Sequence, residues 1–547
     1  MSVNLFEAAL QPVVNLDTDI VVYVPGYAVK GPGEPTLVNS SSFTALFGEE
    51  PYKFKTIQDT TIPKNNTFAT RPDKSWLYAK GLVDAGLTVL YHRVNPHNIG
   101  KASTTIDCFT LKGAEGSATL AALDPAKAFS AQAKYFGMFY TDLTVSFTPS
   151  QPGGNTTVKV KRGVDTLETV VVSFNPAKNN YIGNINFKYV DFFTGDPDSG
   201  TQQIGFENLQ LAAWLSETEN AGKSLYVEAN AAPLYLTPPE VGGTPIAEEF
   251  TVSGFQTLLE GELEGEDAPF NVCLDTDRFP TVTYVTTGGY YQSEAIAGAL
   301  QSLCWEIKSM AMIDLHDDPI TLSTFGDFQN KLTLLNSEIA AKAKGACFVG
   351  ADTYVIAGSR VVMPDSYGYL SKLASNLSQA IPAWVPVANN PQGVVSAVAT
   401  TRQVDRALRL KANEEKFGPS FNPIVFKQNV GYTIMGNRTT YPADGILGPT
   451  SFLNCQLVVN SVLRSARRAA SDLLIVSTNP NTAFNMFKMA IGRTCDRMLV
   501  NGDGLAAYTI KKLKKTQPAT IDIAINLTVV EGIEVFNIQL SYQIALD

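Results

Sequence analysis

Residues 452–473, FLNCQLVVNSVLRSARRAASDL, show the clearest helical pattern in this chain. Apolar side chains recur there with the period of an α-helix, which predicts a helix that buries one face. The apolar positions are Cys455, Val458, Val459, Val462, Ala466, Ala469 and Leu473. The opposite face carries Arg464, Arg467 and Arg468, so this helix is expected to present three positive charges on one side.

A second helix is predicted to begin near Pro480 and to end at the glycines of residues 501–504. Its apolar positions are Phe484, Phe487, Ile491, Cys495 and Met498. Arg493 and Arg497 lie one turn apart on this helix and add to the basic character of the region. A solvated charged face is the ordinary interpretation of these arginines, and docking to an acidic surface is the alternative.

The chain ends in two segments of strict alternation, residues 521–529 and 536–544, with a turn at Glu531-Gly532 between them. Two strands of about ten residues bury too little surface to be stable alone in water. This hairpin is therefore expected to join a larger sheet, either in its own chain or in a neighbouring subunit.

The segments upstream mix helices and strands. The first 18 residues have a weak pattern and are expected to form an extended arm. A strand at 19–24, a short helix around 43–47, and a helix followed by a buried strand over 75–94 come next. Short β-prone runs between turn residues predict an inserted β domain from 101 to 236.

The part of the chain after residue 270 alternates again. Helices at 293–309 and 324–342 precede strands at 311–315 and 346–357, an order that indicates an α/β sandwich. A helix at 369–380 and a strand at 424–435, closed by a turn at 436–439, follow.

These patterns predict a multidomain protein of mixed α+β and α/β class. Its C-terminal core is an α/β sandwich, its termini are extended arms, and a β-rich domain is inserted. The predicted divisions are an N-terminal arm (1–18), the N-terminal part of the core (19–100), an inserted outer domain (101–240), an α/β core domain (241–420) and a C-terminal domain with a terminal β-hairpin (421–547).

Composition excludes several classes of protein. The chain has 547 residues, a net charge of -10 and a pI of about 5.1, which argues against a general nucleic-acid binder. Its six cysteines are scattered without zinc-site spacing, so reduced and mostly buried thiols are expected. The sequence has no apolar run of about 18 residues and no cationic start, so we expect no membrane insertion and a protein kept in the cytosol.

One acidic group could in principle bind a divalent metal or supply acid and base groups. Its members are His316, Asp317 and Asp318, with Asp275, Asp277 and Asp352. Carboxylates at strand ends are more often turn formers, and the chain contains only three histidines. Phosphate-loop, nucleophile-elbow and zinc-protease motifs are absent from the sequence. We therefore expect no catalytic, cofactor or metal site, and a metal-dependent hydrolase stays a minor alternative.

The order of several short motifs resembles a known family. A strand, GPGEP, LV, SSSF and LFG precede a helix and AGLTVLYHRV, while GYTIMGNRTT stands before the arginine-rich helix, the second helix and the final strands. This order is similar to that of the tail sheath proteins of contractile-tailed bacteriophages and related contractile injection systems. The similarity covers about residues 20–98 and 270–547, and the tryptophan and proline segment IPAWVP at 381–386 belongs to it.

The resemblance implies a structural function without chemistry. Such a chain would form stacked hexameric rings around an inner tail tube, would bind baseplate and tail terminator proteins, and would contract to drive the tube through a cell envelope. It would assemble in the host cytoplasm and act in the virion, with its inserted domain displayed on the outside.

Two groups of residues receive expected roles from this resemblance. The tube-facing residues would be Arg464, Arg467, Arg468, Arg493 and Arg497. Strand exchange between subunits would use the N-terminal arm and the final hairpin, at Val13, Val14, Leu16, Ile521, Ile523, Ile525, Phe536, Ile538 and Leu540. The alternative is a β-rich surface-binding protein, an adhesin or tail decoration, in which residues 101–236 recognise carbohydrate.

Overall fold

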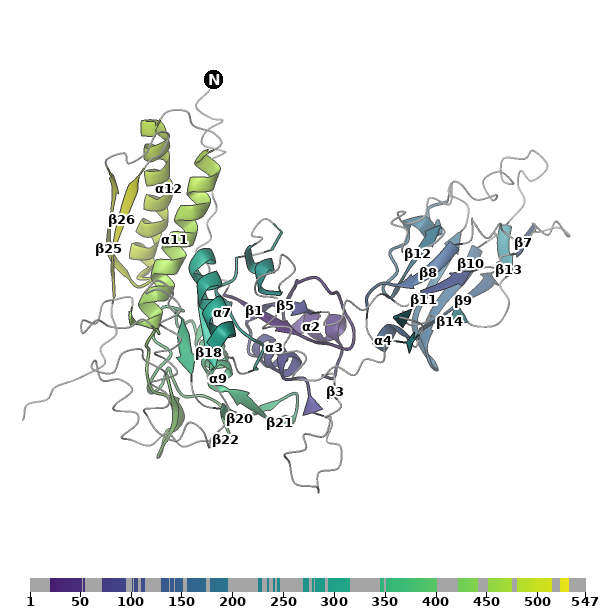
Figure 1. Cartoon of the computed structure of the whole chain (residues 1–547), viewed down its shortest axis with the longest axis horizontal. Helices are drawn as coiled ribbons and strands as arrows, with labels where there is room; N and C mark the ends of the chain where they lie inside the picture. The colour runs from purple at the N-terminus through teal and green to yellow at the C-terminus, as the bar shows by residue number, and fades with distance from the viewer. Residues whose placement is uncertain are drawn as a thin grey trace, which may run out of the picture.

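The computed structural model describes most of the predicted elements (Figure 1). The residues that it describes are 20–51, 53–54, 71–94, 101, 103–106, 110–113, 129–136, 138–141, 143–150, 155–173, 178–194, 225–228, 234–235, 240–241, 244–245, 269–274, 278–279, 281–290, 294–314, 345–348, 351–400, 422–440, 451–474, 480–513 and 522–530. The predicted N-terminal arm, the helix expected at 324–342 and the strand expected at 536–544 lie outside these residues.

A six-stranded sheet forms the centre of the molecule, in the order β19-β18-β17-β1-β5-β2. All its neighbours are parallel except β2, which runs antiparallel to β5. Its strands are β1 (Val21–Gly26), β2 (Thr36–Val38), β5 (Thr88–Arg93), β17 (Tyr284–Val285), β18 (Met310–Asp314) and β19 (Ala346–Phe348). The predicted sandwich therefore exists, but it combines residues 21–93 with residues 284–348 instead of belonging to the C-terminal part alone.

Helices cover both faces of this sheet. Along β1, Val22 and Val24 pack in the cluster that contains the helices on one face, whereas Val21 and Tyr23 pack in the cluster on the other. Such alternation between two buried layers is expected for a mainly parallel sheet. The first face holds α2 (Ser40–Phe47), α3 (Lys74–Asp84) and α9 (Asp365–Ser378), and the second holds α7 (Glu294–Ile307) and the 3₁₀ helix η6 (Pro269–Leu274).

Side-chain caps fix where two of these helices begin. Asn39 Oδ1 accepts from the backbone N–H groups of Ser41 and Ser42, and the Ser42 hydroxyl accepts from the Asn39 N–H, which makes a capping box for α2. The buried Asp73 carboxylate accepts from the N–H groups of Ser75 and Trp76 at the start of α3. The start of α3 is within one residue of the predicted position, whereas α2 begins at Ser40, before the predicted 43–47, and is capped by Asn39.

The inserted segment forms a separate β unit at one end of the molecule (Figure 1). Its main sheet has the antiparallel order β11-β10-β9-β14, and a second sheet has the order β12-β8-β6. Its elements are β6 (Ser103–Ile106), β7 (Thr110–Gly113), β8 (Phe129–Ala133), α4 (Met138–Thr141), β9 (Leu143–Ser150), β10 (Asn155–Arg162), β11 (Asp165–Ser173), η2 (Ile182–Asn184), β12 (Val190–Thr194), β13 (Leu225–Glu228) and β14 (Leu234–Tyr235). The prediction of a β-rich insertion agrees with these strands.

The C-terminal unit consists of two long helices covered by a two-stranded sheet (Figure 1). Its elements are α11 (Leu453–Leu474), α12 (Pro480–Asn501), β25 (Leu505–Lys512) and β26 (Ile523–Val529). Both helices agree with the predicted bounds. The sequence analysis missed β25, which pairs with β26 in antiparallel register. The lysine run after residue 510 therefore begins inside a strand.

Three other predictions need correction. The single strand expected at 346–357 is two strands, β19 and β20 (Ala351–Ile356), in different sheets. The single strand expected at 424–435 is a hairpin of β23 (Ile424–Lys427) and β24 (Gly431–Ile434), because Asn429 and Gly431 take positive φ at its turn. Residues 437–439 of the expected turn are buried, and Thr439 pairs with Ala346, the first residue of β19.

The remaining described strands form small sheets. β20 pairs with β21 (Ser359–Pro364) and β22 (Ala399–Thr400). Two further pairs are β3 (Lys53–Phe54) with β4 (Arg71–Pro72), and β15 (Glu240–Val241) with β16 (Thr244–Pro245).

Candidate functional site

The arginine-bearing face of α11 lies against the C-terminal end of α7. Arg464 Nη1 donates to the carbonyl oxygen of Lys308 at 2.8 Å, and Arg467 Nη1 donates to that of Glu306 at 2.6 Å. One turn earlier on α11, Asn460 Nδ2 donates to the carbonyl oxygen of Ser309 at 3.1 Å. Two of the three arginines therefore contact the core of their own chain, although Arg467 remains exposed to solvent and Arg464 is half-buried.

The other predicted basic residues have different surroundings. Arg468 is exposed beside Arg467, and Arg493 is exposed on α12, while Arg497 is half-buried. Among the described residues, no hydrogen bond or ion pair joins Arg468 to α7. Arg468 and Arg493 are thus the predicted docking residues that project most freely from the C-terminal helices.

Trp305 and Lys308 lie at the same end of α7 as the arginine contacts. The sequence analysis missed both residues. Trp305 on α7 is 41% exposed, and the Lys308 ammonium lies 3.7 Å from the centre of its ring. Burial lowers the pKa of Lys308, and the nearby Arg467 guanidinium lowers it further. No local pattern in the sequence could place Lys308 beside Arg467, because 159 positions separate them along the chain.

The predicted strand-exchange residues are only partly described. Ile523 and Ile525 on β26 are half-buried and pack against the apolar cluster of α11 and α12 in their own chain. Val13, Val14, Leu16, Ile521, Phe536, Ile538 and Leu540 lie outside the described residues. Within the described part of the chain, β25 and β26 pair only with each other, so the described strands form a two-stranded sheet and not a larger one.

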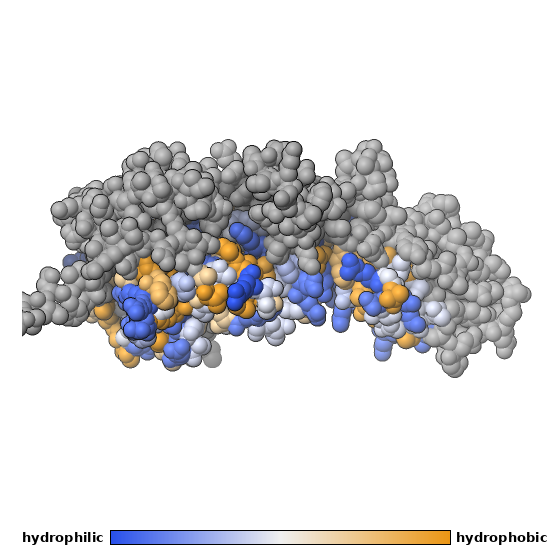
Figure 2. Space-filling view, turned by 90° about the horizontal axis from the view of Figure 1, so that it is seen from below, coloured by the Kyte–Doolittle hydropathy of each residue, from blue (hydrophilic) through white to orange (hydrophobic). Residues whose placement is uncertain are grey.

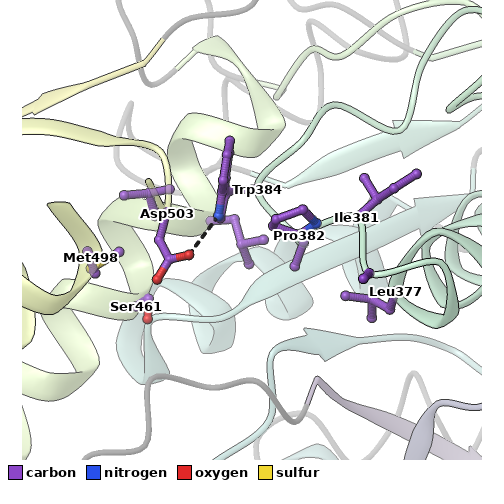
Figure 3. Close-up of a pocket in the computed structure, with 11 residues that line it drawn as sticks. Leu377, Ile381, Pro382, Trp384, Ser461, Met498 and Asp503 are labelled. Atoms are coloured by element: carbon purple, nitrogen blue, oxygen red, sulfur yellow. Dashed lines mark hydrogen bonds between the residues drawn. The ribbon is translucent and has the colours of Figure 1, made fainter. Parts of the chain in front are cut away.

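A pocket of about 360 Å³ lies where α9 and the IPAWVP segment meet the two C-terminal helices (Figure 3). Its lining is mostly apolar, with Trp384 and Pro382 on one side and Met498 on the other. Trp384 Nε1 donates to Asp503 Oδ1 at 3.2 Å across this junction. The pocket brings together no pair of acid and base groups suited to catalysis, and the Trp384–Asp503 bond ties the C-terminal unit to the core.

The predicted acidic cluster is mostly outside the described residues. His316, Asp317, Asp318, Asp275 and Asp277 are not among them, and Asp352 is buried in β20. Across the described ranges, no group of three or more His, Cys, Asp or Glu side chains could hold a metal. The hydrolase alternative therefore gains no support from the described residues.

One buried carboxylate has a strongly shifted pKa. Asp314 ends β18 and accepts hydrogen bonds from the Ser366 N–H and hydroxyl at the start of α9. Burial raises the pKa of Asp314 to about 7, and the two hydrogen bonds from Ser366 oppose that shift. Because α9 begins at this carboxylate, we assign Asp314 to helix capping from a neighbouring strand.

The cysteines of the described residues match the expectation. Cys273, Cys304, Cys347, Cys455 and Cys495 are all free and buried. Burial raises the pKa of the Cys495 thiol to about 11, so this group stays protonated near neutrality. In the described part of the chain, no helix has the length and hydrophobicity that a membrane span requires.

The surface does not mark a docking site by hydrophobicity alone. Figure 2 shows hydrophobic and hydrophilic side chains interspersed on one face of the molecule. The exposed large hydrophobic residues are scattered over different elements, as with Val355 on β20, Phe426 on β23 and Met489 on α12. The α7–α11 junction therefore stands out from the rest of the described surface by its polar contacts and not by exposed apolar area.

Comparison with known proteins adds evidence about the fold. No protein-family model matches the sequence, and no curated protein matches it. A sheath tail protein from Listeria innocua matches with a TM-score of 0.50 and 11% identity, over 97% of this chain and 99% of that one. This chain has the sheath tail protein fold.

Two further structures are similar, with lower TM-scores. A sheath tail protein from Desulfitobacterium hafniense gives a TM-score of 0.46 at 10% identity, over 94% of this chain and 97% of that one. The helical sheath of the anti-feeding prophage in its contracted state gives 0.38 at 16% identity, over 56% of this chain and 84% of that one. Both TM-scores are lower than that of the Listeria innocua protein, on which the assignment of the fold rests.

Proposed function

We propose that this chain is the structural subunit of a contractile tail sheath. The observation that carries the proposal is the fold match across 97% of this chain to a sheath tail protein. The subunits would polymerise as stacked hexameric rings around an inner tube, in a phage tail or a related injection system. Contraction of this polymer would drive the tube through a cell envelope, and the chain itself would catalyse no reaction.

Such a polymer needs joints that survive contraction. The β25–β26 sheet supports strand exchange as the joint, because its described strands pair only with each other and leave both outer edges to further strands. An arm or hairpin from a neighbouring subunit could add to either edge through backbone hydrogen bonds. We propose that the N-terminal arm and the residues after Val530 supply these strands.

The tube contacts must be weaker than these joints, because contraction breaks them. We propose that the basic side of the C-terminal helices, with Arg464, Arg467, Arg468, Arg493 and Arg497, faces an acidic tube surface. Arg468 and Arg493 would make the direct contacts, because Arg464 and Arg467 already bond to the end of α7. The net charge of the chain is -10, so a local group of cations is suited to directing one partner to one face. Baseplate and terminator proteins would bind the ends of the polymer.

Electron microscopy of the purified full chain tests this function. Stacked rings or tubes, alone or with the tail tube protein added, are the expected result. Persistent monomers in the presence of tube protein would contradict it. Carbohydrate binding by the full chain, removed by changes in residues 101–236, would then favour the surface-binding alternative.

A chain without residues 1–17 tests whether the N-terminal arm is needed for assembly but not for folding. The truncated chain is expected to stay folded and to lose long polymers, since the arm would supply a joint and not a core element. Circular dichroism checks the fold, and microscopy checks the polymer. Polymers of normal length from the truncated chain would rule out the arm as a joint.

A further inference from the structure

The C-terminal end of α7 is followed by a non-glycine residue with a positive φ angle. Lys308, directly after the last helical residue, takes a positive φ of 59°, a conformation more often adopted by glycine. The Ser309 N–H then donates back to the Cys304 carbonyl at 2.9 Å. This arrangement is a Schellman cap, which satisfies carbonyl groups near the helix end but leaves others without an intrahelical donor.

The polar stripe of α11 supplies donors to one carbonyl group in the last turn of α7 and to two in the residues directly after it. Asn460, Arg464 and Arg467 follow at i, i+4 and i+7, and they donate to the carbonyl oxygens of Ser309, Lys308 and Glu306. The order is reversed between the two segments, so the stripe runs antiparallel to the chain it contacts. Each side chain thus matches one carbonyl.

Two further features hold this contact in place. Gln456 Nε2 donates to Asn460 Oδ1 at 2.6 Å, which fixes the Asn460 amide with its nitrogen toward Ser309. The helix end carries partial negative charge, so two guanidinium groups are favoured there by electrostatics as well as by hydrogen bonding. The Lys308 side chain turns away and covers the Trp305 ring.

We propose that Asn460, Arg464 and Arg467 are positioning residues that fix α11 on the end of α7. We name this group the α7–α11 clamp. It holds the C-terminal helix pair in one orientation relative to the central sheet, because α7 packs directly on β18. The clamp itself is independent of the proposed sheath function, whereas its consequence for docking rests on that function: the clamp orients Arg468 toward a partner.

The test compares Arg464→Ala and Arg467→Ala, singly and together, with Arg468→Ala in the full chain. Arg468→Ala is a matched control because it removes the same charge from the next position of the same helix. Hydrogen exchange is measured at the amide of Ser309, which closes the cap. Trp305 emission is measured as the difference from the same variant carrying Trp305→Phe.

The clamp predicts about tenfold faster exchange at Ser309 in the double variant, the ratio that corresponds to about 1.4 kcal/mol. It also predicts a shift of Trp305 emission, because Lys308 loses its fixed position over the ring. Arg464→Lys, which keeps the charge and loses the fork of donors, should behave like Arg464→Ala. Arg468→Ala should leave both signals within twofold of the unaltered chain.

Two results would overturn the proposal. Unchanged exchange and emission in the double variant would show that α11 does not hold the end of α7. Equal changes in Arg468→Ala would assign the effect to general charge. Both measurements use unassembled subunits, so their failure is separate from a failure to form polymers, which would contradict only the proposed function.

Discussion

Two parts of the molecule join the central sheet through arginine, and they do so in different ways. The inserted β unit packs its Phe136 ring against Arg93, which is fully buried and whose own hydrogen bonds lie within the core. Its Nε donates to the Ala28 carbonyl at 2.7 Å, its Nη1 donates to the Gly31 carbonyl at 3.0 Å, and the Phe136 ring lies 3.9 Å from the guanidinium. The C-terminal helix pair is joined through buried residues of α11, through the Trp384–Asp503 bond and through the clamp, where Arg467 is exposed and Arg464 is half-buried.

The difference concerns access to water. Both contacts send guanidinium groups to backbone carbonyls, but water can replace the Arg467 bond and cannot reach the Arg93 bonds. A buried attachment of this kind is costly to break, whereas an exposed one can be exchanged for other partners. We therefore expect the Arg93 contact to persist, and the Arg467 bond to be the contact that another partner can replace.

The largest expected effect is that of Arg93→Ala. It leaves the carbonyls of Ala28 and Gly31 buried without their donor and removes the surface on which Phe136 packs, so we expect a loss of about 3–5 kcal/mol. Urea unfolding, with hydrogen exchange at the Gly31 amide, measures it. Arg278→Ala is the control, since its ion pair with Glu34 is exposed and should contribute almost nothing. Equal effects of the two changes would refute the comparison.

The dependence of stability on pH distinguishes the contribution of the core residue Asp314 from the contributions of the two arginine contacts. Guanidinium groups stay charged throughout, whereas Asp314 has its pKa raised to about 7 by burial, against about 3.9 in an unfolded chain. A raised carboxyl pKa favours folding at low pH, so this contribution is lost as pH rises from about 4 to about 7 and stays constant above.

Asp314→Asn should remove that part of the pH dependence, because an amide does not titrate, and it should keep the fold, because the amide can keep both contacts with Ser366. Thermal unfolding at several pH values provides the measurement. Burial raises the pKa of Asp73 as well, so a smaller slope should remain in the variant. An identical slope in the unaltered chain and the variant would exclude Asp314 as its source.

A smaller effect is expected for Gly33→Ala. A Cβ there would lie 2.6 Å from Cε1 of Phe136 and would push this ring from the Arg93 guanidinium, at a cost of about 1–3 kcal/mol. Gly492→Ala in α12 is the matched control, because its nearest neighbour, the Tyr508 hydroxyl, is 3.4 Å away. Alanine favours helices, so the control should be neutral or stabilising. Urea unfolding compares them, and a neutral Gly33→Ala would mean that the insertion is loosely held.

The smallest effect is expected for Trp384→Phe, which keeps a ring in the pocket and loses the donor to Asp503. We expect a loss of about 1 kcal/mol, confined to the C-terminal unit. Hydrogen exchange in β25 measures it, since this strand follows Asp503. Asp503→Asn, which keeps the accepting oxygen, should cost less. A larger loss for Asp503→Asn would show that the carboxylate has another function.

Periodicity succeeded where a segment has one apolar face and one neighbour on that face. The bounds of α11 and α12 followed from their helical spacing, and β1, β5 and α3 followed from short apolar runs between turn residues. Strand β25 was not predicted, because a register shift at residues 505–507 interrupts its alternation and lysines end it. The hairpin at 424–434 was predicted as a single strand, because a glycine inside an apolar run can mark either a bulge or a turn.

The sequence by itself determined the helices, most strands, the β-rich insertion and the positions of the cations, because these depend on neighbours within a few residues. Only the tertiary structure decided that distant segments share one sheet, that Arg93 is buried in the joint with the insertion, and that Arg464 and Arg467 bond to the end of α7. Such contacts join residues as distant as Thr286 and Tyr23, which are 263 positions apart, and hydrogen-bond partners at that distance leave no periodic signal in the chain.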